Sequence, residues 1–493
     1  MSVRQEATKI LRHTFVYGLG GIISQVIGFF MLPIYTRYLS PADYGVLELL
    51  LITTGIIGTI IAVGITQAVF RFYYEYEDDR DRNEVISTGV ISFAILGFCS
   101  LFLLSFACGA LSSVVLGSRE YWPYFLVCFA TVWFSTLTRM GMDYLRIREW
   151  STIYLVISIA NLVVSLSLNI YFVVFAELGV MGILMSSLIS SIMFAIVLVL
   201  PLMVKVGLRF SFSKCNEMLR FGAPLIVSDV GRSIANRSDR YFIRGFGTLE
   251  ATGIYSLGYR FGTIIHTFVT SPFLQIWFPR RMASFKEQDA EQTFSQIFTY
   301  FLVVLTFAGL GISVVIKDVV HIVTTPPFYE AYKIVPLVVL AYIIFSFYYH
   351  FSIALFVHKK TKHIAGIDAA TSALNLILNY FLIKHYLAWG AVAATIASFL
   401  FRVAATYVAG IRFQMIKLEK TRIAQLLLCA FLVYWLSTLV DMGTPWLNIP
   451  LKSLFALLYI LILWATGFLH ESEALVLRKA WTNIGARVLL RAH

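Results

Sequence analysis

Long apolar segments follow one another along almost the whole chain and are separated by short polar connections. A helix needs about 20 apolar residues to cross the hydrocarbon core of a bilayer, which is roughly 30 Å thick. Windows of this length predict an all-α polytopic membrane protein with fourteen transmembrane helices. The predicted spans cover residues 13–39, 46–70, 85–116, 121–142, 151–175, 179–204, 217–243, 253–280, 293–316, 332–357, 363–386, 388–412, 421–441 and 450–469.

The 39 lysines and arginines are divided unevenly between the predicted connections. The two termini and the even-numbered connections hold 27 of them, the odd-numbered connections hold 8, and four lie within spans. Because cytoplasmic loops carry an excess of Lys and Arg, both termini are predicted to be cytoplasmic. The C-terminal residues 471–493 combine an apolar side with basic residues, which predicts a cytoplasmic amphipathic helix lying on the membrane.

The composition fits this topology and excludes several classes of protein. Hydrophobic residues make up 59% of the 493 residues and charged residues only 13%, so there is too little polar surface for a soluble domain. The inward-facing loops account for most of the net charge of +12, and no nucleic acid partner is predicted. An ATP-driven pump of the P-loop type is excluded, because no Gly-x-x-x-x-Gly-Lys-Ser/Thr motif occurs.

The seventh predicted span, residues 217–243, carries four charged residues within a length that crosses the bilayer: Asp229, Arg232, Arg237 and Asp239. A charge near the bilayer centre costs roughly 2.5–3.5 kcal/mol on insertion scales, so such residues usually face a hydrated cavity or a partner. At 100° per residue, the charged and amide side chains fall within an arc of about 160°. The span is therefore predicted to turn one face toward a polar cavity.

Three short segments recur at offsets of 208 to 210 residues, each at the same place relative to the spans. The pairs are 38–46 with 246–254, 168–173 with 378–383, and 182–187 with 390–395. Each copy holds six spans, so both copies have the same orientation and the substrate site is expected between them. The predicted parts are an N-lobe (1–210), a C-lobe (211–416), two extra C-terminal helices (417–470) and the tail (471–493).

Two six-span lobes followed by two extra helices resemble the polysaccharide-transporter branch of the multidrug/oligosaccharidyl-lipid/polysaccharide (MOP) exporter superfamily. The segments 32–45 and 253–260, with the paired Leu-Asn sequences at 168–169 and 378–379, carry this resemblance along the whole chain. Members include flippases for O-antigen and exopolysaccharide and, more distantly, for lipid II. Span one offers only Ser24 and Gln25 where the lipid II branch has an arginine and an acid, which disfavours lipid II as the cargo.

The resemblance implies a flippase rather than an enzyme. Such a protein moves a polyprenyl-diphosphate-linked oligosaccharide from the cytoplasmic to the outer leaflet of the bacterial inner membrane by alternating access, for surface polysaccharide assembly. The implied partners are this lipid-linked glycan, membrane lipids and the polysaccharide-assembly machinery, and a monomer is expected. Two alternatives remain: a cation-coupled multidrug exporter of the same superfamily, and a membrane-embedded glycan polymerase or ligase.

Arginines within or beside the spans are candidate ligands of the diphosphate, because the guanidinium group forms two-pronged hydrogen bonds with phosphate. Asp229 and Asp239 are candidates for coupling to H⁺ or Na⁺, or for ion pairing, since Asp229 and Arg232 lie three residues apart on a helix. No metal site and no other cofactor are predicted. The substrate-binding candidates are Arg232, Arg237, Arg260, which best matches a cationic residue of the lipid II branch, Arg402, and two that could instead reach the membrane interface, Arg37 and Arg139.

Overall fold

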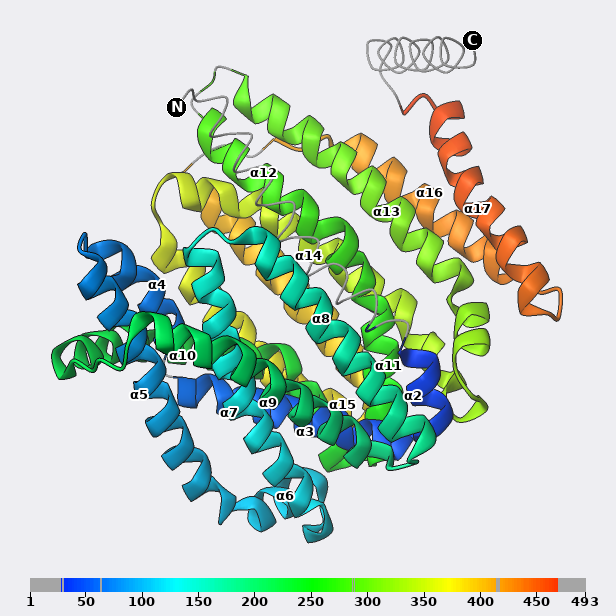
Figure 1. Cartoon of the computed structure of the whole chain (residues 1–493). Helices are drawn as coiled ribbons and strands as arrows, with labels where there is room; N and C mark the ends of the chain where they lie inside the picture. The colour runs from blue at the N-terminus through cyan, green and yellow to red at the C-terminus, as the bar shows by residue number, and fades with distance from the viewer. Residues whose placement is uncertain are drawn as a thin grey trace, which may run out of the picture. The chain divides into compact units, whose positions relative to one another are not determined.

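The computed structural model describes residue 28 and residues 31–62, 64–285, 287, 289–413 and 417–468, apart from the side chains of 227 and 228. Within these residues every regular element is a helix and no strand occurs (Figure 1), which confirms the predicted all-α class. Most of the first predicted span and the whole predicted tail helix lie outside the described residues.

The elements follow the order of the predicted spans. They are α2 (Leu32–Tyr38), α3 (Pro41–Ala62), α4 (Ile65–Glu75), α5 (Asp79–Ser105), α6 (Cys108–Leu116), η1 (Arg119–Tyr121), α7 (Trp122–Ile147), α8 (Ser151–Ile170), η2 (Tyr171–Phe175), α9 (Gly179–Val206), α10 (Phe212–Phe246), α11 (Leu249–Gly262), η3 (His266–Thr270), α12 (Ser271–Ser284), α13 (Ala290–Val323), η4 (Pro326–Ile334), α14 (Val335–Val357), α15 (Thr361–Gly410), α16 (Lys420–Thr438) and α17 (Pro445–Ala465).

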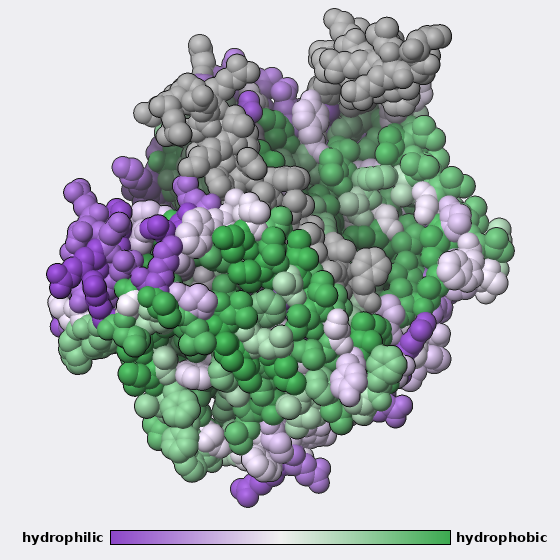
Figure 2. All heavy atoms as spheres, in the orientation of Figure 1, coloured by the Kyte–Doolittle hydropathy of each residue, from purple (hydrophilic) through white to green (hydrophobic). Residues whose placement is uncertain are grey.

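Ten helices in the described part of the chain are long and apolar enough to cross a membrane. Large apolar side chains on them are exposed, such as Leu103 (68%) and Trp464 (66%), and Figure 2 shows apolar residues over much of the visible face. Hydrophilic residues gather there over the ends of α4 and α5 (Figures 1 and 2). The protein is thus a multi-pass membrane protein, while the predicted number of fourteen spans stays a prediction.

The ten helices are four fewer than the fourteen predicted spans, because most of the first span lies outside the described residues and three further stretches differ from the prediction. Helix α10 is 35 residues long, but it carries too many charged residues to be among the ten apolar helices. The predicted eighth span corresponds to α11, η3 and α12, which are not among the ten helices. Helix α15 has 50 residues, about 75 Å at 1.5 Å per residue, and bends at Leu387, where φ is 46°. It therefore contains two membrane-length helices, as the predicted spans 363–386 and 388–412 require.

The chain divides into two compact units. Unit 1 comprises residues 1–256, 323–328 and 376–391, and unit 2 comprises 257–322, 329–375 and 392–493. The core of unit 1 contains fully buried apolar side chains such as Phe125 of α7 and Val173 of η2. Helices α7 and α9 approach closely, because Gly141 leaves room for the Leu198 side chain. The predicted lobe boundaries at 210 and 416 are not tested by this division and stay a prediction.

Within unit 1, the start of α3 and the start of α11 contact each other reciprocally. A Cβ atom on Gly45 would overlap the carbonyl oxygen of Leu249, and one on Gly253 would overlap that of Pro41. Gly253 follows Gly45 by 208 residues, and Leu249 follows Pro41 by the same interval. The contact of Gly45 with Leu249 is thus repeated, with the roles of the two copies exchanged, by the contact of Gly253 with Pro41. Two copies related by a two-fold axis make contacts of this reciprocal kind. The sequence repeat thus reappears as a repeated contact.

A second reciprocal contact joins the same region of unit 1. The Thr36 hydroxyl donates to the carbonyl of Val323 (3.3 Å), and the Arg244 guanidinium donates to the carbonyl of Leu116 (2.9 Å). Positions 36 and 244 are 208 residues apart, and positions 116 and 323 are 207 apart. All these residues belong to predicted outer connections or lie beside them, so the two repeat copies meet at the predicted outer side.

In unit 2, a buried ion pair connects α17, the last described helix, to α13. The ammonium group of Lys452 on α17 lies 2.7 Å from the carboxylate of Asp318 on α13, and both side chains are almost fully buried. Asn448 donates to the same carboxylate at 2.8 Å. Removing one partner of a buried ion pair costs roughly 3–5 kcal/mol, because the other charge stays buried without compensation. This pair therefore fixes the position of α17 within unit 2.

Candidate functional site

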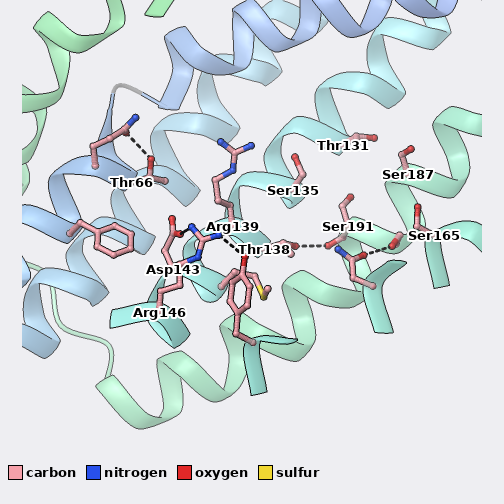
Figure 3. Close-up of a pocket in the computed structure, with 16 residues that line it drawn as sticks. Thr66, Thr131, Ser135, Thr138, Arg139, Asp143, Arg146, Ser165, Ser187 and Ser191 are labelled. Atoms are coloured by element: carbon pink, nitrogen blue, oxygen red, sulfur yellow. Dashed lines mark hydrogen bonds and ion pairs between the residues drawn. The ribbon is translucent and has the colours of Figure 1, made fainter. Parts of the chain in front are cut away.

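A polar cavity of about 740 Å³ lies within unit 1 between α4, α7, α8 and α9 (Figure 3). Its volume is in the range of ligand pockets, about 300–1,000 Å³, but such pockets are usually lined mainly by apolar side chains. Here Phe70 and Met142 are the apolar exceptions among the described lining residues. The other lining residues are Thr66, Gln67, Thr131, Ser135, Thr138, Arg139, Asp143, Arg146, Tyr154, Asn161, Ser165, Ser187, Ser190 and Ser191.

Helix α7 contributes to the cavity a stripe of residues that are polar except for Met142. The positions are spaced by three or four residues, so they lie on one face of the helix. The opposite faces of α7 carry buried apolar residues, among them Phe125 and Phe129. The sequence therefore forms a helix that packs apolar residues into the core and turns this stripe to the cavity. The stripe consists of Thr131, Ser135, Thr138, Arg139, Met142, Asp143 and Arg146.

Helices α8 and α9 complete the wall with shorter polar stripes and hold each other by hydrogen bonds. The Ser190 hydroxyl of α9 donates to the side-chain oxygen of Asn161 on α8 at 2.8 Å. The Thr138 hydroxyl of α7 donates to the backbone carbonyl of Ser191 at 3.1 Å. Polar side chains in membrane helices commonly form hydrogen bonds of this kind with neighbouring helices.

The second predicted span is interrupted at Gly64, and the helix that follows, α4, lines the cavity. Gly64 has a φ of +62° and is the N-cap of α4, which separates α4 from α3. A Cβ atom there would lie 2.7 Å from the Cα atom of Gly222 on α10, so only glycine fits both the backbone angle and the contact. The break places Thr66 and Gln67 on the cavity wall, where the Thr66 hydroxyl donates to the Gln67 side chain at 2.8 Å.

One end of the cavity is cationic. Arg146 lies 3.3 Å from the carboxylate of Asp143 and donates to the Tyr154 hydroxyl at 2.5 Å, while its guanidinium group covers the Tyr154 ring at 4.8 Å from the centroid. Arg139 is exposed and makes no ion pair or hydrogen bond with any described residue. Two arginines and one carboxylate leave this end with a net positive charge, which suits a doubly charged anionic ligand.

Of the arginines predicted from the sequence, Arg139 is the one that lines this cavity. Arg37 is exposed in the last turn of α2, and Arg237 is exposed on α10. Arg232, also on α10, pairs with Asp229 one turn earlier, and 69% of its side chain is exposed. The expected pairing of Asp229 with Arg232 is therefore present. The roles of these residues in substrate binding stay predictions.

The remaining predicted site residues lie away from the cavity. Asp239 is buried in unit 1, where its carboxylate lies 2.7 Å from Arg240 and accepts a hydrogen bond from Tyr255 at 2.5 Å. In unit 2, Arg260 is partly buried on α11. Arg402, also in unit 2, lies 2.6 Å from Asp368, and its guanidinium group covers the Tyr348 ring at 4.1 Å. The bend in α15 brings Asp368 and Arg402 together although 34 residues separate them.

Several cavity residues were not predicted as site residues. They include Asp143, Arg146 and the serines of α8 and α9. The signal that could have found them is the spacing of polar residues by three or four positions in the fourth to sixth predicted spans. Single hydroxyls in apolar helices usually bond to their own backbone, so the signal emerges only when the three helices are considered together.

The ion pair on α10 gives a test of the predicted role of Arg232. If Arg232 serves only as the partner of Asp229, the double substitution Asp229→Asn, Arg232→Gln should leave transport unchanged, because it removes both charges together. If Arg232 binds substrate, the double variant should stay at least about tenfold slower, the effect of losing one charge-assisted hydrogen bond. The single substitution Asp229→Asn serves as the control, and the rate is measured in proteoliposomes.

A sequence profile of the family described as "Polysaccharide biosynthesis protein" matches residues 10–286, more than half of the chain. No curated protein sequence matches the chain. Among solved structures, the lipid II flippase MurJ in an inward closed conformation is similar, with a TM-score of 0.74 at 13% identity over 92% of this chain and 99% of that chain.

Two structures of a multidrug resistance MATE family transporter of the MOP superfamily are also similar. The inward-facing conformation has a TM-score of 0.64 at 16% identity over 79% of this chain and 94% of that chain. The outward-facing conformation has a TM-score of 0.56 at 16% identity over 83% and 96%. At these identities the similarity establishes a shared fold.

Proposed function

Because the chain belongs to the family of polysaccharide biosynthesis proteins, which confirms the resemblance found in the sequence, we propose that it is a flippase. Its proposed cargo is a polyprenyl-diphosphate-linked oligosaccharide, moved from the cytoplasmic to the outer leaflet of the bacterial inner membrane by alternating access for surface polysaccharide assembly. The observation that supports this most is a polar cavity with two arginines, Arg139 and Arg146, inside a bundle of membrane-length helices.

The cavity is lined by arginines at one end and by hydroxyl and amide side chains elsewhere, and these match the two parts of the cargo, the diphosphate and the glycan. A diphosphate carries negative charge that is costly to bring into the membrane, and guanidinium groups bind phosphate oxygens with short, charge-assisted hydrogen bonds. The glycan carries many hydroxyl groups, which donate and accept hydrogen bonds as the serine, threonine and amide side chains of the cavity do. Arg139 and Arg146 are therefore assigned to the diphosphate, and the hydroxyl-bearing wall to the sugars.

The polar lining also distinguishes this proposal from multidrug export. Pockets for drug-like molecules are lined mainly by apolar and aromatic side chains with a few polar groups. In this cavity the described apolar residues are only Phe70 and Met142. A lipophilic cation would also be repelled by the net positive end, which favours an anionic, hydroxyl-rich cargo.

The orientation predicted from the charge distribution places the cationic end of the cavity near the cytoplasm. Arg146 lies at the end of α7 and Tyr154 at the start of α8, on either side of a predicted cytoplasmic connection. A cargo that approaches from the cytoplasmic leaflet would therefore meet the arginines first. Coupling to H⁺ or Na⁺ through Asp229 or Asp239 stays part of the proposal.

Binding of the cargo to the purified protein tests the assignment of the arginines. A ligand present at 100 times its Kd stabilises the folded state by about 2.7 kcal/mol. Polyprenyl-diphosphate-linked glycan should therefore raise the melting temperature in detergent by several degrees, and Arg139→Ala should reduce this shift. Polyprenol without phosphates is the matched control. An equal shift with polyprenol would contradict a role for the arginines in binding.

A further inference from the structure

The end of the cavity away from Arg146 is lined by small hydroxyl and amide side chains from α7, α8 and α9 (Figure 3). We call it the hydroxyl end. In the close-up, Thr131, Ser135, Ser165, Ser187 and Ser191 lie together on the side opposite Thr66. The hydroxyl end consists of Thr131, Ser135, Asn161, Ser165, Ser187 and Ser191.

Hydrogen bonds within the helices orient several of these groups. The hydroxyls of Thr131, Ser187 and Ser191 donate to backbone carbonyls of the preceding turn at 2.8 to 3.0 Å, which leaves their oxygen lone pairs for a ligand. The side-chain oxygen of Asn161 accepts from Ser190, and its amide nitrogen makes no hydrogen bond with a described residue. The hydroxyl end therefore offers both acceptors and a donor, as a sugar hydroxyl requires.

Charge is absent from the described residues of this end. On α7, Arg139 follows Ser135 of the hydroxyl end by one helical turn and follows Thr131 by eight residues, about 12 Å along the helix axis. A carboxylate bound beside Thr131 and Ser187 would therefore lie two helical turns from Arg139, with no cation among the described residues of the hydroxyl end. An unpaired charge in such a place is strongly disfavoured, whereas a neutral hydroxyl can replace its hydrogen bonds to water with hydrogen bonds to these side chains.

We propose that the hydroxyl end binds an uncharged sugar unit of the cargo and discriminates against an acidic sugar at the same position. This inference rests on the proposed flippase function and adds the class of glycan that the cavity accepts. The arginines hold the diphosphate at the cationic end, and the spacing between the two ends sets which sugar unit reaches the hydroxyl end. The transporter should therefore select its cargo by the charge of that unit.

The test uses two synthetic polyprenyl-diphosphate glycans that differ only in one sugar, a neutral hexose or the corresponding hexuronic acid. Purified protein is reconstituted in liposomes, and the transport rate of each cargo is measured. The neutral cargo should move at least about tenfold faster, since polar sites reject mismatched groups strongly. In the Ser187→Lys variant the preference should invert, because the added ammonium group pairs with the carboxylate.

A matched pair of serines controls for damage to the helix. The hydroxyls of Ser186 and Ser187 both donate to the Ile183 carbonyl, at 2.8 and 3.0 Å, but only Ser187 lines the cavity. Ser187→Ala should slow the neutral cargo several-fold, and Ser186→Ala should not. If the lysine variant fails to accumulate, Thr131→Lys provides the same added charge at the other wall.

The outcomes separate this inference from the function on which it rests. Equal rates for the two cargoes in the wild-type protein, or an unchanged preference in a lysine variant that inserts and folds, would overturn the selection by charge while the flippase function stands. Transport of neither cargo would overturn the flippase function, and this inference with it.

Discussion

Replacing both Arg139 and Arg146 with alanine should slow transport of a polyprenyl-diphosphate-linked glycan by about 100-fold or more. Each hydrogen bond to a charged group is worth about 1.5–3 kcal/mol, and 1.4 kcal/mol corresponds to a factor of ten. Both arginines line the same cavity, so the diphosphate loses both partners together. Removing Arg146 also leaves Asp143 without its ion-pair partner, which makes this end of the cavity negative.

Two further variants make the test specific. Arg148→Ala removes the same charge at the same end of α7, but Arg148 does not line the cavity, so its transport rate should stay close to that of the wild-type protein. Lysine at positions 139 and 146 should restore only part of the rate, because it keeps the charge but loses the two-pronged geometry. A double alanine variant that folds and transports at the wild-type rate would show that the diphosphate binds elsewhere.

Valine at Gly45 or Gly253 should prevent the reciprocal contact between α3 and α11 from closing. The added side chain would overlap the backbone of Leu249 or Pro41, and overpacking costs roughly 1–3 kcal/mol, about 5- to 150-fold in an equilibrium. Thr252, beside this contact, is fully buried. In a protein without other cysteines, Thr252→Cys should react with an impermeant thiol reagent several-fold faster when either valine is present.

Gly55 provides the control on the same helix. A Cβ atom there has no atom within 4 Å among the described residues, so Gly55→Val should change neither the labelling of Thr252→Cys nor the transport rate. The Gly45 and Gly253 variants should both slow transport, because a contact at the predicted outer side has to reform in each cycle. Labelling of Thr252→Cys only from the cytoplasmic side would contradict the predicted orientation.

The sequence predicts most helices well, because apolar length is a local property. The predicted spans 151–175 and 179–204 correspond to Ser151–Phe175 and Gly179–Val206. The prediction is least successful where tertiary packing decides the backbone. The kink at Leu387, the π-helical turn η3 and the break at Gly64 depend on neighbouring helices that a window of one segment does not contain.

The candidate site is predicted less completely than the fold. Arg139 is found because an arginine beside an apolar span is conspicuous, but Ser187 and Asn161 carry no such signal. Their importance arises from the alignment of polar stripes on α7, α8 and α9, which only the packed bundle reveals. The pairing of Arg402 with Asp368 could not be predicted from the sequence either, because it depends on the bend in α15.

Transport of defined cargo by the purified wild-type protein tests the proposed function most directly. The protein is reconstituted in liposomes with a fluorescent polyprenyl-diphosphate-linked neutral oligosaccharide in both leaflets, and an impermeant quencher is added outside. Liposomes with the wild-type protein should lose the protected fraction of fluorescence, while empty liposomes and liposomes with the Arg139→Ala, Arg146→Ala variant should retain it. A protected fraction that stays the same in liposomes with correctly folded wild-type protein as in empty liposomes would contradict the account.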